Sequence, residues 1–380
     1  MNHMKRVAHV TTLHRAMDIR VFHKECRSLA EKGWEVHLLA PHPPAEQLDS
    51  VWFHDVSWST TPPRLLRIWR RLQTAYRVAR RVNAHIYHLH DPELILVGFA
   101  LKLRGAKVIY DAHEDKPRQA LRSRSNPLLA WGRAFMWAAL EALAKVSVDR
   151  FVAATPSIAR GFPSKRTIII HNFPRIEDFP GLQGNHPEPR RLPSCIVYAG
   201  GISRERGILA ILSALTILAR SRETHLVLLG GFCSSSLQIE AAQHPGWHWV
   251  RFLGWQPYAR VVEELEKASV GLVLFEPAPN HVEALPNKLF EYMAAGLPIL
   301  ASDFPLWRDL LTAHRCGVSV DPLDPDAIAG ALLHLLVNPA EAQEMGGNGR
   351  SAVLGQMNWN REAQSLITLY KSFNIRNKRP

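Results

Sequence analysis

Two glutamates, Glu283 and Glu291, stand eight positions apart in the stretch EALPNKLFE (residues 283–291). On one continuous helix they would lie about 80° out of phase and about 12 Å apart along the axis, too far apart to share one reacting atom. Pro286 divides the stretch, because proline is tolerated in the first turn of a helix and disfavours helix in the residue before it. We therefore expect Glu283 in a loop and Glu291 inside a helix that runs from about Pro286 to Gly296.

The start of this expected helix is suited to an anion. The backbone amides of Asn287, Lys288 and Leu289 would have no partner within the helix and would point out of its N-terminus. The simpler alternative is that Glu283 is a solvated loop charge and Glu291 a surface helix residue. The apolar residues around Glu291 in LFEYM favour a partly buried acid that has a partner.

The turn GGISRERG (residues 200–207) is a second candidate anion site. It joins an apolar run to a helical pattern, and Gly200 and Gly201 would let backbone amides approach a phosphate at the helix N-terminus. Arg204 and Arg206 would then neutralise its charge. The turn is not a Walker sequence, because no Gly-Lys-Ser/Thr follows. The alternative is an ordinary turn with a solvated basic face.

The motif HLHDPEL holds four residues of types that bind metals: His88, His90, Asp91 and Glu93. The sequence shows no matching histidine pair elsewhere, and Pro92 forces a turn. We therefore favour a loop that lines a binding cleft over a metal centre.

A second candidate for metal chemistry is the D-x-D pair Asp324 and Asp326. The pair directly precedes a helical pattern, where acids serve as caps and as partners of the helix dipole. We favour capping, and we predict neither a metal nor a cofactor.

Short apolar runs alternate with helical patterns throughout the chain, which indicates parallel sheets covered on both faces. The Pro- and Gly-rich stretch PGLQGNHPEPRRLPS (residues 180–194) is the best linker. We expect two Rossmann-like, doubly wound α/β domains, 1–185 and 186–355, facing a central cleft, and a C-terminal helix within 356–380. In such sheets ligands bind outside the carboxyl ends of the strands. The turn GGISRERG and the motif HLHDPEL both follow expected strands and so fall at these ends.

Composition restricts the functional class. The 380 residues are 47% hydrophobic, and the four cysteines are scattered, which argues for reduced, mostly buried thiols. The start MNHMKRVAHV lacks the apolar core of a signal peptide, and no uninterrupted membrane span is present, so we expect a cytoplasmic protein. Residues 1–190 hold 29 Lys and Arg against 17 Asp and Glu, whereas the second half is balanced. This one-sided charge attracts a polyanion or an anionic membrane.

Two segments of the basic half are candidates for membrane contact. Residues 64–81 hold seven arginines and no acid, and Leu65, Ile68, Trp69, Leu72, Tyr76 and Ala79 fall on one side of a helix. The apolar stretch 128–146 is the second candidate. The alternative for both segments is a domain helix that buries its apolar side.

Taken together, these segments resemble glycosyltransferase family 4, the retaining enzymes with two Rossmann-like domains. A glutamate, seven residues and a second glutamate, followed by YMAAGLP, resemble the family's nucleotide-sugar site. YAGGISRERGI resembles its diphosphate turn, VRFLGW its base-side strand, and HLHDPEL with VIYDAHED the acceptor-side loops of a bacterial polysaccharide branch. NWNREAQSLITLYKSF resembles the helix that often crosses back to the first domain.

The resemblance implies roles for the matching residues. Glu283 would hold hydroxyls of the donor sugar, Glu291 the ribose, and Arg206 the diphosphate. Where many members carry a second basic residue, directly after the first glycine, this chain has Gly201, and Arg204 is the candidate substitute.

On the acceptor side, the resemblance assigns HLHDPEL, with His90 and Asp91, to an acceptor loop. It places His113 at the reacting centre, where it would bind a sugar hydroxyl or accept a proton; the alternative is a strand-end histidine bonded to backbone. The loop TTLHRAMDIR lacks the paired glycines of many members. Asp18, Arg20 and Lys24 are therefore only candidate acceptor ligands.

The resulting hypothesis is a retaining, metal-independent glycosyltransferase, peripheral at the inner face of the membrane. It would move a sugar from a nucleotide sugar, UDP favoured over GDP, to a glycan or polyprenyl-diphosphate acceptor in exopolysaccharide, capsule or O-antigen synthesis. A nucleotide-sugar epimerase or hydrolase on the same fold is one alternative. A non-enzymatic basic binder of membranes or nucleic acid is another, but no nucleic-acid-binding module is recognisable.

Overall fold

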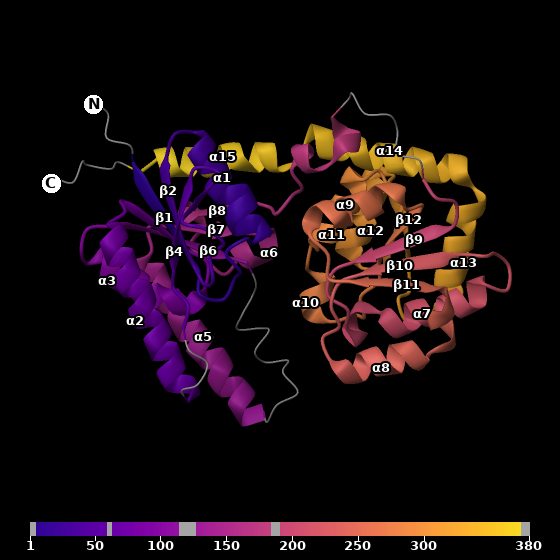
Figure 1. Cartoon of the computed structure of the whole chain (residues 1–380), viewed down its shortest axis with the longest axis horizontal. Coiled ribbons are helices and arrows are strands. Elements are labelled where there is room, and N and C mark those ends of the chain that lie inside the picture. The colour runs from indigo at the N-terminus through magenta and orange to yellow at the C-terminus, as the bar shows by residue number, and fades with distance from the viewer. Residues whose placement is uncertain (1–4, 59–62, 114–126, 184–190, 374–380) are drawn as a thin grey trace. The chain divides into compact units, whose positions relative to one another are not determined.

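The computed structural model describes residues 5–58, 63–113, 127–183 and 191–373. The chain forms two compact units, an N-terminal unit of residues 1–172 and 362–380 and a C-terminal unit of residues 173–361. Each is built on one sheet with helices packed against it (Figure 1). The division falls at Asn172, whereas the sequence placed it at 185, inside the linker 180–194. Residues 184–190 of that linker lie outside the described residues.

The N-terminal sheet has the order β3-β4-β2-β1-β5-β6-β7-β8 within the described residues, and its strand pairs are parallel except for β3 with β4. Its strands are β1 Arg6–Val10, β2 Glu35–Ala40, β3 Gln47–Leu48, β4 Val51–Asp55, β5 Ile86–Leu89, β6 Lys107–Ala112, β7 Arg150–Ala153 and β8 Thr167–Ile169. The edge strand β3 and its neighbour β4 were not predicted, since they carry no long apolar run.

The two faces of this sheet differ. Alternate apolar residues such as Ala8, Val10, Leu89 and Val108 form a core with three helices. The opposite face carries buried polar side chains, among them His9 and His88. The helices of this unit are η1 Ile19–Cys26, α1 Arg27–Glu31, α2 Arg64–Val82, η2 Pro92–Leu94, α3 Ile95–Lys102, α5 Pro127–Ser147, α6 Pro156–Ala159, η3 Ser164–Arg166 and the part of α15 (Trp359–Lys371) from Glu362 onward.

The C-terminal sheet has the order β11-β10-β9-β12-β13-β14 within the described residues, and its strand pairs are parallel. Its strands are β9 Cys195–Ala199, β10 His225–Leu229, β11 Val250–Gly254, β12 Val270–Val273, β13 Ile299–Ser302 and β14 Gly317–Val320. Its helices are η4 Ile176–Asp178, η5 Pro180–Leu182, η6 Arg204–Arg206, α7 Ile208–Leu218, α8 Ser235–Gln243, η7 Pro245–Trp249, α9 Tyr258–Lys267, α10 Pro279–Val282, α11 Asn287–Ala294, α12 Pro305–His314, α13 Pro325–Val337 and α14 Pro339–Gly355.

Both faces of this second sheet are apolar and buried. Cys195 and Val197 of β9 pack with α9, α11 and α12, whereas the alternate residues Ile196 and Tyr198 pack with α7 and α13. Such alternation is what a parallel sheet covered on both sides requires. The predicted fold class, two Rossmann-like parallel-sheet units, is confirmed.

The predicted basic helix is α2. Leu72, Ala75 and Ala79 are buried in the core, but Trp69, expected on the buried stripe, is 58% exposed. Arg71, expected in solvent, is buried and forms an ion pair with Glu93, because it lies on the side of α2 that faces η2. The side chain of Leu65 lies outside the described residues.

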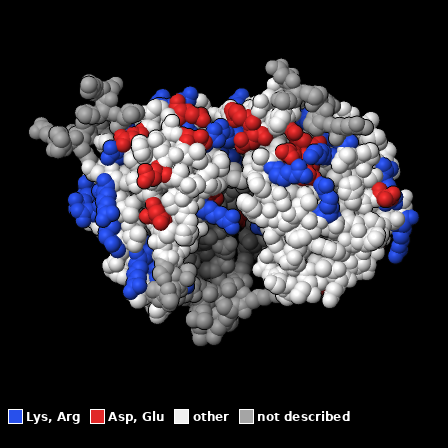
Figure 2. All heavy atoms as spheres, viewed as in Figure 1, with Lys and Arg blue, Asp and Glu red and all other residues white. Residues whose placement is uncertain are grey.

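Basic side chains gather over the α2 and α3 region of the N-terminal unit (Figure 2). In the described part of the chain, no helix combines the length and apolar character needed to cross a membrane. The cysteines Cys26, Cys195 and Cys316 are buried thiols and Cys233 is an exposed one, as predicted for a chain without disulfides.

Candidate functional site

The predicted diphosphate turn follows β9 and leads into α7. Gly200 has φ 124° and Gly207 has φ 75°, conformations that L-residues with side chains rarely adopt. A Cβ at Gly207 would lie 2.3 Å from the Leu274 carbonyl oxygen, and a Cβ at Gly230 would lie 1.9 Å from the Gly200 carbonyl oxygen. The glycines therefore let the turn lie directly against the backbones that follow β10 and β12.

The two arginines of this turn have different partners. Arg206 Nη1 donates to the Gly201 carbonyl at 3.0 Å, and its guanidinium lies 5.6 Å from the centre of the Phe275 ring. Arg204 is about half exposed and pairs with Glu240 of α8, Nη2 to Oε2, at 2.5 Å. Arg206 is thus directed over the glycine turn, whereas Arg204 is directed toward α8.

Lys288 is the unexpected cation of the site. Its Nζ lies 3.6 Å from the centre of the Tyr198 ring and would be 3.4 Å from a Cβ at Gly200. The side chain is buried, and among the described residues its Nζ has no hydrogen-bond partner. Burial, and then the nearby Arg206 guanidinium, hold the pKa of Lys288 well below its usual value. A buried ammonium without an acceptor fits an anion beside the turn.

The helix expected from Pro286 is confirmed as α11, with Pro286 at its N-cap. Glu283 follows the short helix α10, which was not predicted, and is exposed as its C-cap residue. One expectation needs correction: the Leu289 amide donates to the Pro286 carbonyl at 3.0 Å, because the first turn closes tightly. Asn287 and Lys288 therefore remain the candidates for amides that face an anion.

Glu291 lies in α11 beside Tyr258. The Tyr258 hydroxyl donates to Glu291 Oε1 at 3.4 Å, and burial, with the adjacent carboxylate, raises the pKa of Tyr258 well above its usual range. The predicted partner of Glu291 thus comes from α9, the helix after VRFLGW. Nothing in the sequence pattern of α9 pointed to this tyrosine.

In the N-terminal unit the candidate residues gather at the carboxyl edge of the sheet. His113 directly follows β6, and its Nε2 lies 3.0 Å from Asp111 Oδ2 and 3.2 Å from His90 Nδ1. His113 is partly exposed, whereas His90 and Asp111 are buried. Burial raises the pKa of Asp111, but Arg20 and His113 outweigh it, and the net pKa lies well below its usual value. Asp111 is therefore a carboxylate that orients His113.

Asp91 and Asp18 organise the loop after β1. Asp91 Oδ2 accepts from the Thr12 amide at 2.5 Å and from the Leu13 amide at 3.2 Å, and it is buried. Asp18 caps η1 by accepting from the Arg20 and Val21 amides at 2.9 and 3.0 Å. Both carboxylates replace the glycines that the sequence lacks here, because they satisfy the amides of a tightly turned loop.

Arg20 and Lys24 do not reach the surface. Arg20 is 4% exposed and forms two bonds to Asp111, Nε to Oδ2 at 3.0 Å and Nη2 to Oδ1 at 3.1 Å. Lys24 is 2% exposed, and its Nζ donates to the side chain of Asn172 at 2.6 Å. Both side chains are committed to protein partners, so in this structure they offer no cationic surface to an acceptor.

The D-x-D pair caps a helix, as predicted. Asp324 Oδ1 accepts from the Asp326 and Ala327 amides at 3.0 and 3.1 Å at the start of α13.

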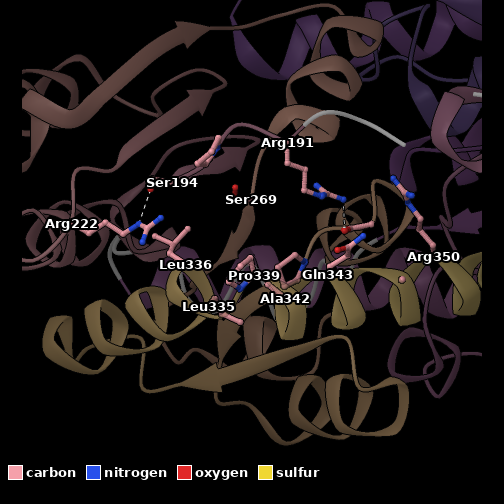
Figure 3. A pocket seen from close by; sticks show the side chains of 14 residues that line it. Arg191, Ser194, Arg222, Ser269, Leu335, Leu336, Pro339, Ala342, Gln343 and Arg350 are labelled. Atoms are coloured by element: carbon pink, nitrogen blue, oxygen red, sulfur yellow. Dashed lines mark hydrogen bonds between the residues drawn. The ribbon is translucent and has the colours of Figure 1, made fainter. Parts of the chain in front are cut away.

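A cavity of about 470 Å³ in the C-terminal unit lies away from this chemistry (Figure 3). Its lining includes Arg191, Arg222, Ser269 and Pro298, which precede strands, so it lies at the amino edge of the sheet. Arg191 donates to the carbonyls of Ala268 and Ala295. Arg222 donates to Ser194, as Figure 3 shows. The cavity is separate from the glycine turn, which lies at the carboxyl edge.

Two α/β units, each on a mostly parallel sheet, form the GT-B architecture. A family model described as "Glycosyl transferases group 1" matches residues 187–352, and one described as "Glycosyltransferase Family 4" matches residues 19–174. The chain belongs to glycosyltransferase family 4.

Curated relatives are distant. D-rhamnosyltransferase WbpZ of Pseudomonas aeruginosa is 26% identical, over 87% of this chain and 86% of that protein. A GDP-mannose-dependent alpha-mannosyltransferase of Mycobacterium tuberculosis is 27% identical, over 92% of this chain and 91% of that protein. Glycogen synthase of Mycobacterium tuberculosis is 26% identical, but the match spans 48% of this chain and 43% of that protein, less than half its length.

Solved structures share the fold. Sucrose-phosphate synthase of Thermosynechococcus elongatus superposes with a TM-score of 0.75 at 19% identity, covering 97% of this chain and 98% of that one. Anabaena HepE in complex with UDP-glucose superposes with a TM-score of 0.72 at 12% identity, covering 98% of this chain and 100% of that one.

Proposed function

We propose that the protein is a retaining glycosyltransferase that takes its sugar from a nucleotide sugar and binds the diphosphate at the turn of residues 200–207. The observation that carries this proposal is Lys288, a buried amine beside Gly200 and near Arg206, whose Nζ has no hydrogen-bond partner among the described residues. Charge developing on a leaving diphosphate would be stabilised by both cations and by the amides at the start of α11. The reaction then needs no divalent ion at the diphosphate.

In the proposed reaction, an acceptor hydroxyl oxygen forms a bond to the anomeric carbon while the bond from that carbon to the diphosphate oxygen breaks. The electron pair leaves with the diphosphate, and the hydroxyl proton passes to a base. His113, oriented by Asp111 at 3.0 Å, is the candidate to bind the acceptor hydroxyl or accept this proton. Glu283 would hold hydroxyls of the donor sugar, and Glu291 the ribose.

The structure favours Lys288 over Arg204 as the second cation of this site. Arg204 is engaged by Glu240 on the exposed side of the turn, whereas Lys288 lies next to Gly200. The position where many family members carry a basic residue is Gly201 here, and a Cβ at Gly201 would lie only 2.8 Å from Arg206 Nη1. We therefore propose that Lys288 supplies, from α11, the charge missing at Gly201.

Donor and acceptor remain proposals. HepE was solved with UDP-glucose, which supports a uridine donor, but a relative matched over 92% of the chain uses GDP-mannose, so both bases belong in a screen. A bacterial surface polysaccharide is the proposed product, and a glycan or polyprenyl-diphosphate the proposed acceptor.

We further propose that the N-terminal unit rests on an anionic membrane surface through α2, α3 and α5. These adjoining helices expose large apolar side chains, among them Trp69 at 58%, Leu103 at 75%, Trp131 at 67% and Phe135 at 77%. Exposed arginines of α2 lie beside them, as an amphipathic contact with anionic lipid requires.

A thermal-shift screen of nucleoside diphosphates and nucleotide sugars tests the donor site, because ligands that bind the folded state raise its melting temperature. The proposal predicts a shift with a uridine or guanosine diphosphate and with its sugar. A protein that binds none of them is not a nucleotide-sugar enzyme. Donor consumption without any acceptor, followed over time, would instead support an epimerase or hydrolase.

A further inference from the structure

A cluster of three histidines and one glutamate lies inside the N-terminal unit. His9 of β1 and His88 of β5 are neighbours in the parallel register, and His90, two residues on, points to the same face. Glu25 of η1 lies against that face. All four side chains are 3% exposed or less.

The ligand atoms of these residues lie close together. Glu25 Oε2 is 3.6 Å from His9 Nδ1, 3.8 Å from His88 Nδ1 and 3.9 Å from His90 Nε2. His9 Nδ1 is 3.0 Å from His90 Nε2. One ligand atom from each residue lies within 4.8 Å of the others.

Direct hydrogen bonds account for only part of this arrangement. They join His9 Nδ1 with His90 Nε2 at 3.0 Å and His88 Nδ1 with the Tyr370 hydroxyl at 2.8 Å, but they do not account for Glu25. The distances from Glu25 Oε2 to the imidazole nitrogens are too long for hydrogen bonds. Glu25 Oε1 lies 3.1 Å from Arg20 Nε, but that N–H is directed to Asp111. Among the described residues, neither oxygen of Glu25 accepts a hydrogen bond, and His88 Nε2 has no partner. A fully buried carboxyl group without a donor calls for an additional occupant.

Four of the six ligand-to-ligand distances fit a metal ion and are too small for a water molecule, and all six lie within 4.8 Å. Four ligands at about 2.0–2.1 Å around a tetrahedral ion lie about 3.4 Å from one another. Partners of a water molecule at about 2.8 Å would lie about 4.6 Å apart. The four observed distances, 3.0 to 3.9 Å, bracket the first value.

The opposite ring nitrogens have the partners that metal-binding histidines usually have. The Tyr370 hydroxyl lies 3.1 Å from His9 Nε2. His90 Nδ1 lies 3.2 Å from His113 Nε2 and 3.6 Å from Asp111 Oδ2. These groups fix the orientation of both imidazoles toward Glu25.

We propose that His9, His88, His90 and Glu25 form a structural binding site for a divalent transition metal ion, with Zn²⁺ as the best match. Three imidazoles and a carboxylate are a zinc ligand set, and a closed site with four protein ligands is typical of a structural rather than a catalytic ion. The ion would join β1, β5 and η1. This site is independent of the proposed donor chemistry, because no residue of the C-terminal unit takes part.

The first test uses the intact wild-type protein. Metal content is measured by mass spectrometry after purification without a histidine tag, and Co²⁺ is titrated into metal-depleted protein while the visible absorption is followed. The proposal predicts one Zn²⁺ per chain, or uptake of one Co²⁺ with the intense absorption of tetrahedral coordination. A folded protein that binds neither ion overturns it and leaves a protonated Glu25 bonded to Asp111 as the account of this cluster.

Variants distinguish the proposed metal ligands from histidines outside the cluster. Glu25→Gln and His88→Gln should lose stoichiometric binding, and Tyr370→Phe should weaken it by about 10- to 100-fold, as loss of a supporting group does. His54→Gln is the matched control, since His54 pairs with His37 at 2.8 Å outside the cluster. Should the ligand variants fail to fold, the metal affinities of Tyr370→Phe and His54→Gln still test the proposal. Equal affinities in these two variants would contradict the proposal.

Discussion

The ammonium nitrogen of Lys288 lies 3.6 Å from the centre of the Tyr198 ring, buried beneath the turn at Gly200. The contact is a cation–π interaction, which only partly offsets the desolvation of a charge. The position links the first turn of α11 to the end of β9, the two elements of the proposed donor site. Burial of this amine should lower the stability of the free protein and strengthen the binding of an anion.

We predict that Lys288→Met stabilises the protein. The substitution keeps the volume but removes a buried polar group that has no acceptor in the described part of the chain. Burying such a group costs roughly 1–3 kcal/mol. Chemical denaturation without ligand should show a higher free energy of unfolding. Lys267→Met is the control, because Lys267 is 45% exposed at the end of α9, and its stability should change little. A clear loss of stability in Lys288→Met would mean that the ammonium has a partner in the free protein.

Diphosphate binding should take up a proton at Lys288. Burial lowers its pKa in the free protein, whereas a bound anion would raise it again. Affinity for UDP or GDP should therefore fall as the pH rises from about 8 to about 10, above the phosphate ionisation near 6. Calorimetry in buffers with different ionisation enthalpies measures the uptake directly. The same lowered pKa makes unfolding of the ligand-free protein less favourable at higher pH, since the unfolded chain binds the additional proton. Release of a proton on binding would contradict this assignment.

Glu283 should act on the sugar and not on the nucleotide. Glu283→Gln is expected to reduce transfer by about 100-fold while the affinity for the nucleoside diphosphate stays within about threefold. The exposed Glu263→Gln provides the control for an acid in the same unit, with unchanged transfer. Initial rates and diphosphate calorimetry on the same samples separate the two effects. A Glu283→Gln variant with wild-type transfer activity would contradict the proposal that Glu283 binds the donor sugar.

Membrane contact should depend on α5. The double variant Trp131→Ser with Phe135→Ser removes two side chains that are 67% and 77% exposed. Binding to vesicles rich in phosphatidylglycerol should weaken by about tenfold or more, and high salt should weaken wild-type binding through the arginines of α2. Trp255→Ser, a change at a 67% exposed tryptophan of the other unit, should leave binding unchanged. Equal binding to neutral and anionic vesicles would exclude an electrostatic contribution of the α2 arginines to membrane binding.

The fold and the donor turn were predictable because local patterns determine them. Alternating strand and helix patterns indicated both sheets, Pro286 marked the start of α11, and Asp324 is the cap that its place before a helix indicated. The glycines of the 200–207 turn were predicted to let backbone amides approach a phosphate, which stays a prediction; the structure adds that Gly207 lies against the Leu274 carbonyl oxygen.

The side-chain partners were not predictable, because they come from elements far apart in the sequence. His9 and His88 are 79 positions apart and meet through the strand order, and Glu25 reaches them from η1. The sequence argument against a metal rested on the missing partner for HLHDPEL, and His9, the partner that we propose, lies beside His88 and His90 only in three dimensions. Burial likewise argues against an acceptor role for Arg20 and Lys24, which lie in η1 and not in the expected loop.

The most direct test of the donor site is calorimetric binding of UDP and GDP to the wild-type protein, Arg206→Met, Lys288→Met and Lys267→Met. We predict that the wild type binds one of the two nucleotides, that Arg206→Met and Lys288→Met each weaken this binding by at least about tenfold, and that Lys267→Met binds like the wild type. Unchanged affinity in Lys288→Met would contradict the account.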